Sequence, residues 1–253
     1  MPESSPSIRL VYIQARDGMP SDEAFYKAWD GFRRRRIPCA LFDSSEIDRG
    51  TLPLARDTLV AGAIRIVETA LATVGGNVPV ADNLPGCLTK YRGRQAWQST
   101  WGELRSRYGK TGPPEPLFVK PYRRNKGFPS IALYNAEDMQ AAAALPDSHE
   151  VLVSEYVVFV SEWRCFVCRG QLLELCHYSG DMFRYPDSAV IKSAISDFGD
   201  DAPAGYGIDF GVLTDGRTVL VEVNDGYALG PYGLNSTEYS ELLEARWLEL
   251  VGV

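Results

Sequence analysis

The sequence has no apolar run of membrane-spanning length and no excess of basic residues. Its best candidate, residues 59–74, carries Arg65 and Glu68 and falls short of the roughly 18 uninterrupted apolar residues that a span needs. Lys and Arg number 26 against 33 Asp and Glu, so the formal net charge is −7. A negative charge disfavours binding to phosphate backbones or anionic membranes. We therefore expect no membrane segment and no nucleic-acid partner.

Cysteine and histidine are also too sparse or too irregular for several kinds of site. The five cysteines are an odd number at irregular spacing, and residues 1–7 lack the features of a secretory signal, so we expect a cytoplasmic protein. Cys165 and Cys168 lie in a strand-like segment, where residues three apart face opposite sides, which disfavours a zinc or redox pair. With only His149 and His177 present, a histidine-based hydrolase is disfavoured.

The two common glycine-rich phosphate-binding sequences are missing as well. Neither Gly-x-x-x-x-Gly-Lys-Ser/Thr nor Gly-x-Gly-x-x-Gly occurs in the chain. A P-loop or a dinucleotide-binding Rossmann site therefore has no support, and any nucleotide phosphates must be held in another way.

Strand and helix signals instead indicate an α/β protein built from successive units. The chain has 253 residues, 45% of them hydrophobic, which suffices for a sizeable core. We place the units at residues 1–84, 85–150 and 151–253. The expected strands are 8–13, 40–42, 58–61, 117–121, 131–134, 151–160, 164–168, 172–178, 206–213 and 218–224, and the expected helices are 21–36, 62–74, 89–108, 135–144 and 236–250.

Residues 206–224 predict a β-hairpin that brings two carboxylates together. The Asp215-Gly216 pair is typical of a two-residue hairpin loop, and a loop of that length places Asp209 opposite Glu222. The same register pairs apolar residues on the other face, namely Ile208 with Val223, Phe210 with Val221 and Val212 with Val219.

The predicted carboxylate pair needs a positive charge beside it. In this register the Cβ atoms of Asp209 and Glu222 would be about 5 Å apart, and Asn224 would point the same way. Two carboxylates and an amide oxygen suit Mg²⁺, which usually shares its remaining positions with water and substrate phosphates. A neighbouring Lys or Arg, or a shared proton, would also relieve the repulsion. The residues alone leave these alternatives open.

Several motifs, in their order along the chain, resemble the ATP-grasp superfamily, and more narrowly its clade named for one arginine and two lysines. They are Val119-Lys120-Pro121 with Lys126-Gly127-Phe128, Ser161-Glu162-Trp163-Arg164, Asp209 with Glu222-Val223-Asn224-Asp225-Gly226, and Gly230-Pro231-Tyr232-Gly233. The similarity covers roughly residues 58–250. It implies an ATP-grasp fold, with two α/β lobes and nucleotide between them, preceded by a small Rossmann-like pre-grasp lobe.

The resemblance implies a role for each matching residue. ATP would bind with Mg²⁺ on Asp209, Glu222 and Asn224, and Lys120 and Lys126 would contact its phosphates. Lys126 and Arg164 would be catalytic, with Arg164 stabilising the transferred phosphoryl group or an acyl phosphate. A segment similar to the superfamily's adenine-binding hinge adds the candidate nucleotide contacts Glu155, Val157 and Glu162. For Arg164, a salt bridge to Glu162 or Glu174 is the alternative.

The implied activity is an ADP-forming ligation of a carboxylate and an amine. ATP would phosphorylate the carboxylate, and the amine would attack the acyl phosphate to give an amide or peptide bond. The substrates would be small molecules, amino acids or peptides. The alternatives are a small-molecule kinase on the same fold and a nucleotide-binding module without turnover. A pure binder has no need of two like charges held together, which disfavours the last.

Overall fold

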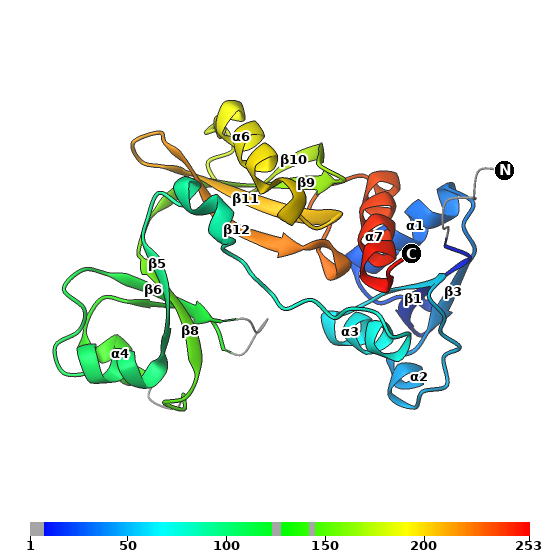
Figure 1. The fold of residues 1–253 in the computed structure, drawn as a ribbon, viewed down its shortest axis with the longest axis horizontal. Helices are drawn as coiled ribbons and strands as arrows, with labels where there is room; N and C mark the ends of the chain where they lie inside the picture. The colour runs from blue at the N-terminus through cyan, green and yellow to red at the C-terminus, as the bar shows by residue number, and fades with distance from the viewer. Residues whose placement is uncertain (1–7, 123–127, 142–144) are drawn as a thin grey trace.

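The computed structural model describes residues 8–122, 128–141 and 145–253, which form three four-stranded sheets (Figure 1). Each sheet has a hydrophobic core on at least one face, and helices supply much of the packing. The mixed α/β class expected from the sequence is therefore confirmed.

The N-terminal lobe is a small sheet whose main strands run parallel. In its centre β1 (Leu10–Arg16) lies between β3 (Cys39–Phe42) and β4 (Thr58–Ala61), and the short β2 (Met19–Pro20) pairs antiparallel with the end of β1. Its helices are α1 (Glu23–Arg34), α2 (Ser44–Asp48) and α3 (Ile64–Thr73). The side chains of Asp22 and Asp43 cap α1 and α2 by accepting backbone N–H groups that have no partner within the helix.

The second sheet is antiparallel, with the order β5-β8-β6-β7. Its strands are β5 (Ala96–Thr100), β6 (Leu117–Pro121), β7 (Ile131–Leu133) and β8 (Glu150–Glu155), and its helices are α4 (Trp101–Tyr108) and α5 (Ala136–Ala141). Trp101 and Leu104 of α4 pack against Val119 and Val151 of the sheet. Lys120 comes next to a buried strand position and near the end of β6, where its side chain leaves this core.

The third sheet has the order β10-β9-β11-β12 and is antiparallel throughout. Its strands are β9 (Phe159–Cys168), β10 (Gln171–Gly180), β11 (Gly205–Leu213) and β12 (Thr218–Asp225). One face packs against α6 (Ser188–Phe198) and η1 (Gly86–Tyr91), with Cys165 and Ile208 in that core. The short helices η2 (Gly199–Asp201) and η3 (Gly226–Ala228) follow α6 and β12.

The C-terminal helix α7 (Ser236–Val251) joins the third sheet to the N-terminal lobe (Figure 1). Phe166 of β9, Leu242 of α7 and Phe32 of α1 belong to one core. The crossing of α1 and α7 is so close that a Cβ at Gly31 would lie 1.8 Å from the carbonyl oxygen of Ser236. A glycine is therefore required at this crossing.

The helix expected over 89–108 is wrong. This stretch forms η1, a bend, β5 and α4 instead, so that Trp97 lies in a strand and only Trp101 lies in a helix. Gly93 has a left-handed φ of 61°, which interrupts a right-handed helix, and Thr100 starts α4 with a capping box to Glu103. Trp97 and Trp101 are thus four residues apart, as in a helix, although they lie on either side of a strand-to-helix junction.

Two further expectations differ from the structure. The strand expected over 151–160 ends at Glu155, and β9 begins at Phe159 after an irregular connection. The sequence analysis also did not identify β2, β5, α2 or α6. All five cysteines are free, and Cys165 and Cys168 both lie in β9, where Cys165 is buried and Cys168 is half-buried. Within the described residues, no helix has both the length and the apolar character needed to cross a membrane.

Candidate active site

The β11–β12 hairpin places Asp209 opposite Glu222 and Ile208 opposite Val223, as the sequence predicted. Nearer the loop the predicted register is wrong by one residue, because Phe210 pairs with Leu220 and Val212 with Thr218. The expected partners Val221 and Val219 are therefore incorrect, although the pairing at the carboxylates is confirmed.

Two irregularities of one residue each compensate for one another. The loop has three residues rather than two: the Leu213 N–H donates to the Arg217 carbonyl at 2.8 Å, and the Gly216 N–H donates to the Leu213 carbonyl at 2.9 Å. Gly216 has a φ of 87°, which is typical of the left-handed last position of such loops. A β-bulge at Val221 then adds one residue to β12 and brings Glu222 back opposite Asp209.

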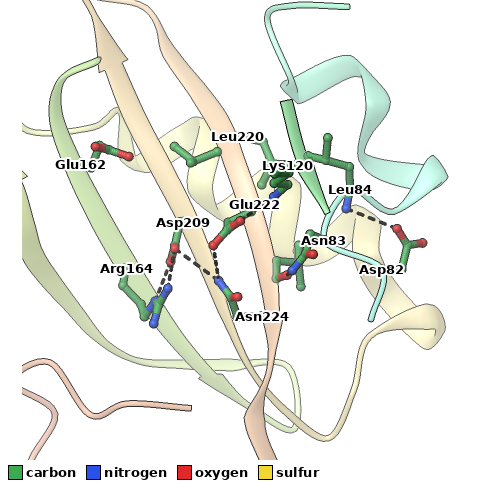
Figure 2. Close-up of polar contacts among 12 residues, drawn as sticks. Asp82, Asn83, Leu84, Lys120, Glu162, Arg164, Asp209, Leu220, Glu222 and Asn224 are labelled. Carbon is green, nitrogen blue, oxygen red and sulfur yellow. Dashed lines mark hydrogen bonds and ion pairs between the residues drawn. The ribbon is translucent and has the colours of Figure 1, made fainter. Parts of the chain in front are cut away.

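Arg164 and Asp209 form a buried, bidentate ion pair across β9 and β11 (Figure 2). The Nε atom of Arg164 donates to Oδ1 of Asp209 at 2.7 Å, and Nη2 donates to Oδ2 at 2.6 Å. The sequence-based alternative of a salt bridge to Glu162 or Glu174 was therefore wrong about the partner. Arg164 faces inward and its charge is balanced by the candidate metal ligand itself.

Lys120 balances the second carboxylate from another sheet. Its Nζ atom donates to Oε2 of Glu222 at 2.7 Å, so the ion pair connects β6 with β12. The Nδ2 atom of Asn224 donates to Oε1 of Glu222 at 3.0 Å and to Oδ2 of Asp209 at 3.4 Å. Figure 2 shows these side chains converging on one face of the third sheet. The repulsion between the two carboxylates is thus relieved by Arg164 and Lys120.

The two carboxyl groups have different proton affinities. Burial raises the pKa of Asp209 to about 6, against the opposing effect of the Arg164 hydrogen bonds and charge. Burial also raises the pKa of Glu222, but the charge of Lys120 and the hydrogen bonds from Lys120 and Asn224 outweigh it and leave that pKa below its ordinary value. Glu222 is therefore the more firmly ionised of the two.

The donor set fits Mg²⁺ when substrate and water complete the coordination. Each ionised carboxylate has about four lone-pair sites, so the ion pairs with Arg164 and Lys120 leave further sites on Asp209 and Glu222. The Asn224 amide now donates to both carboxylates and would have to turn for its oxygen to act as a ligand. Within the described residues no group of three or more His, Cys, Asp or Glu side chains is placed to hold a metal. Magnesium commonly has few protein ligands and keeps waters and phosphate oxygens.

Two of the remaining predicted site residues, Glu155 and Glu162, lie in strands of the same two sheets. Glu162 is two positions before Arg164 in β9, and its carboxylate accepts a hydrogen bond from the Tyr178 hydroxyl at 3.1 Å. Glu155 ends β8, is exposed, and accepts the Gln95 N–H at 2.9 Å. Val157 lies in the connection between β8 and β9. Lys126 lies outside the described residues.

Arg94 is a residue of this site that the sequence analysis did not single out. Its Nη1 donates to the Leu220 carbonyl at 2.8 Å, and its Nη2 donates to the Val221 carbonyl at 3.0 Å. These carbonyls lie at the bulge directly before Glu222. Burial lowers the pKa of Arg94, and the charge of Arg92 lowers it further. In the sequence Arg94 looked like one of several arginines around a helix, so no signal distinguished it.

A cleft of about 1130 Å³ opens beside the ion pairs. Arg164, Glu222 and Asn224 form part of its wall. Glu68 of α3 and the segment 79–83 line it from the N-terminal side, and Tyr232 and the η3 region line it from the C-terminal side. The charged groups therefore meet a space large enough for a small-molecule ligand.

Comparison with known proteins gives one family and one fold. Residues 91–242, more than half of the chain, match an ATP-grasp domain, family 2 of the clade named for one arginine and two lysines. No curated protein matches the chain in sequence.

Three solved structures are similar over nearly the whole chain. D-cycloserine synthetase DcsG has a TM-score of 0.62 at 14% identity, over 94% of this chain and 99% of that chain. D-alanine–D-alanine ligase from Bacillus anthracis complexed with ATP has a TM-score of 0.58 at 14% identity, over 96% of each chain. The ATP-grasp ligase PsnB complexed with precursor peptide PsnA2 and AMPPNP has a TM-score of 0.54 at 12% identity, over 97% of this chain and 99% of that chain. At these identities the likeness concerns the fold.

Proposed function

Because this chain belongs to the ATP-grasp family, in the clade named for one arginine and two lysines, we propose that it is an ATP-dependent ligase that joins a carboxylate to an amine and releases ADP. One observation carries the proposal: Asp209, Glu222 and Asn224 gather beside Lys120 and Arg164, and three members of this cluster line a single cleft, namely Arg164, Glu222 and Asn224. This combination of oxygen ligands and fixed cations complements the charges of a magnesium nucleotide and of a carboxylate substrate.

In this proposal Asp209, Glu222 and Asn224 hold Mg²⁺, which would neutralise charge on the transferring phosphoryl group. Lys120 contacts a phosphate of ATP, and Lys126 is assigned to a second phosphate contact. Lys120 is paired with Glu222, so in this proposal Lys120 exchanges a carboxylate for a phosphate oxygen when the nucleotide binds. Each partner of the ion pair then has a new partner of opposite charge.

The adenine end of the nucleotide is assigned to the connection between β8 and β9. The Val157 N–H makes no hydrogen bond to another backbone group of the described residues, so it can donate to a base edge. Glu155, at the end of β8, and Glu162, in β9, are the candidate contacts for the ribose hydroxyls.

The five free cysteines also suit the reducing cytoplasm, which we propose as the location.

The reaction proceeds through an acyl phosphate in this proposal. A carboxylate oxygen of the substrate attacks the γ-phosphorus of ATP, the bond to the ADP oxygen breaks, and the amine then displaces phosphate from the acyl carbon. Arg164 stabilises the transferring group, because its Nη1 atom is the guanidinium nitrogen not used by Asp209. The site offers cations and metal ligands rather than an activated protein nucleophile, so the phosphoryl acceptor is the substrate itself.

We further propose amino acids or peptides as the substrates. Similar folds belong to proteins named D-alanine–D-alanine ligase and D-cycloserine synthetase, and to PsnB, which was solved with a precursor peptide. The cleft has room for such a ligand beside Arg164, and the acidic residue Glu68 also lines it.

The test is a screen of carboxylate and amine pairs that measures ADP release and product mass. With an active carboxylate, hydroxylamine in place of the amine should give a hydroxamate together with ADP. Release of AMP and pyrophosphate would reject the mechanism, and a stable phosphorylated product without hydroxamate would favour the kinase alternative. Lys120→Ala should abolish turnover, whereas the matched control Lys90→Ala, which removes a surface ion pair with Asp197, should not.

A further inference from the structure

Tyr232 occupies a backbone conformation that its residue type rarely adopts. It has a φ of 43°, and Gly233 beside it has a φ of 135°. The Leu234 N–H donates to the Pro231 carbonyl at 2.7 Å and closes a turn around these two residues. A left-handed backbone strains a bulky residue, and glycine or asparagine would avoid that strain. Because 54% of Tyr232 is exposed, packing into the core does not explain its presence.

The ring of Tyr232 covers the guanidinium group of Arg164. The Cζ atom of Arg164 lies 4.6 Å from the ring centroid of Tyr232 and 5.8 Å from that of Tyr178. The two rings are 5.8 Å apart at an angle of 49°. Gly230 lies beside the same ring, since a Cβ there would be in ordinary van der Waals contact with it at 3.4 Å. A cation over an aromatic face is attracted to it, and the strained turn brings that face to Arg164.

Two different constraints therefore act on one guanidinium group. The two hydrogen bonds from Nε and Nη2 to Asp209 restrict rotation of the Arg164 guanidinium group within the plane of that group. The Tyr232 ring restricts the tilt of that plane. The Nη1 atom has no hydrogen-bond partner among the described residues, and both Arg164 and Tyr232 line the cleft. A donor held in a fixed direction acts on a developing charge without first reorganising.

We propose that Tyr232 is a positioning residue, whose ring holds the Arg164 guanidinium so that Nη1 is directed at the phosphoryl group being transferred. The inference rests on the proposed function, in which Arg164 acts on that group. It also gives the Gly230-Pro231-Tyr232-Gly233 motif a physical role, because Gly233 permits the turn and the turn presents the aromatic ring.

The experiment measures binding of ADP with Mg²⁺, in the absence and presence of beryllium fluoride, which occupies the position of a γ-phosphoryl group. We expect beryllium fluoride to tighten ADP binding to the wild-type chain, and Arg164→Ala to remove that gain. Tyr232→Leu should reduce the gain by about 3- to 30-fold, the range that corresponds to one cation–π contact, and leave binding of ADP alone unchanged. Tyr232→Phe keeps the ring and should keep the gain.

Controls separate positioning from general damage. Tyr185 is also an exposed aromatic residue and stacks on Trp163 rather than on Arg164, so Tyr185→Leu should behave as the wild type. Melting temperatures show whether the variants are folded. An unchanged gain in Tyr232→Leu would overturn the proposal, and so would a Phe variant that loses as much as the Leu variant. Failure of the wild type to bind ADP would instead refute the proposed function, and the inference with it.

Discussion

Replacing Glu222 with Gln should have opposite effects on ATP binding with and without Mg²⁺. The Glu222 carboxylate accepts a hydrogen bond from Nζ of Lys120 at 2.7 Å, and the same carboxylate is a proposed metal ligand. Glutamine has nearly the same size and can still accept the hydrogen bond from Asn224, but it carries no charge. The substitution therefore frees Lys120 for a phosphate and at the same time removes an anionic ligand of the metal.

The burial of the ion pair sets the size of the effect. The Lys120 and Glu222 side chains are 17% and 28% exposed, which places them between surface and buried pairs. Exposed pairs contribute about 0.2–1 kcal/mol, and removal of one partner of a buried pair costs about 3–5 kcal/mol. An intermediate value of about 1–2 kcal/mol corresponds to about 5- to 30-fold in affinity. Metal-free ATP should bind to Glu222→Gln more tightly by that factor. The affinity for Mg²⁺·ATP should fall by about tenfold or more, because a carboxylate ligand is lost.

Calorimetric titration of ATP, in EDTA and in excess Mg²⁺, measures both effects. Glu174→Gln removes an exposed carboxylate from β10, at the opposite edge of the same sheet, and should leave both affinities unchanged. In the double variant Lys120→Ala/Glu222→Gln the metal-free gain should disappear, since no lysine is freed. If the single variant binds metal-free ATP no better than the wild type, Lys120 does not choose between carboxylate and phosphate, and the reasoning is wrong. Unaltered Mg²⁺·ATP binding would refute the role of Glu222 as a ligand.

Three further substitutions test neighbouring parts of the site. Asp209→Asn leaves the buried Arg164 without a charged partner and should lower the free energy of unfolding in urea by about 3 kcal/mol; a loss below about 1 kcal/mol would contradict a tightly coupled pair. Lys120→Ala should weaken ATP about tenfold or more and leave adenosine unchanged, whereas equal losses for both ligands would indicate structural damage. In Arg94→Lys the lysine cannot bind both carbonyls of the bulge, so the affinity for Mg²⁺·ATP should fall by about tenfold. The control Arg92→Lys, at a residue that does not contact the bulge, should keep that affinity. Equal effects of the two substitutions would contradict a role of Arg94 in the site.

The sequence predicted the centre of the site better than its surroundings. The face alternation of a hairpin was enough to place Asp209 opposite Glu222, and the order of short motifs predicted the ATP-grasp fold. The loop length was wrong by one residue, and the pairing at the carboxylates was right only because the bulge at Val221 restored it. A bulge has no strong signature in a single sequence, because it depends on what holds its free carbonyls, here Arg94.

Contacts between distant segments were beyond the reach of sequence patterns. Lys120 and Glu222 are 102 positions apart, and nothing local in either strand indicates that they meet. The alternative salt bridge of Arg164 to Glu162 or Glu174 was wrong because the sequence did not show that β11 is a neighbour of β9, which brings Asp209 opposite Arg164. The wrong helix over 89–108 has the same origin. The spacing of the tryptophans was visible in the sequence, but the contact that requires a glycine at the left-handed position 93 was not, because a Cβ there would lie 2.3 Å from the distant Val219. All the roles assigned to site residues stay predictions: Lys120, Lys126, Glu155, Val157, Glu162, Arg164, Asp209, Glu222 and Asn224.

The crossing of α7 over α1 has a consequence for how this protein is made. The ribosome synthesises α7 after every other described element, yet its residues fill the core beneath β1, which is among the first to emerge. Part of the apolar surface of the N-terminal lobe therefore stays uncovered while residues 74–235 are synthesised. Contacts over such distances in sequence form slowly and leave the nascent chain open to association with others. The core shared by the N-terminal lobe and the third sheet can therefore be completed only after α7 has left the ribosome.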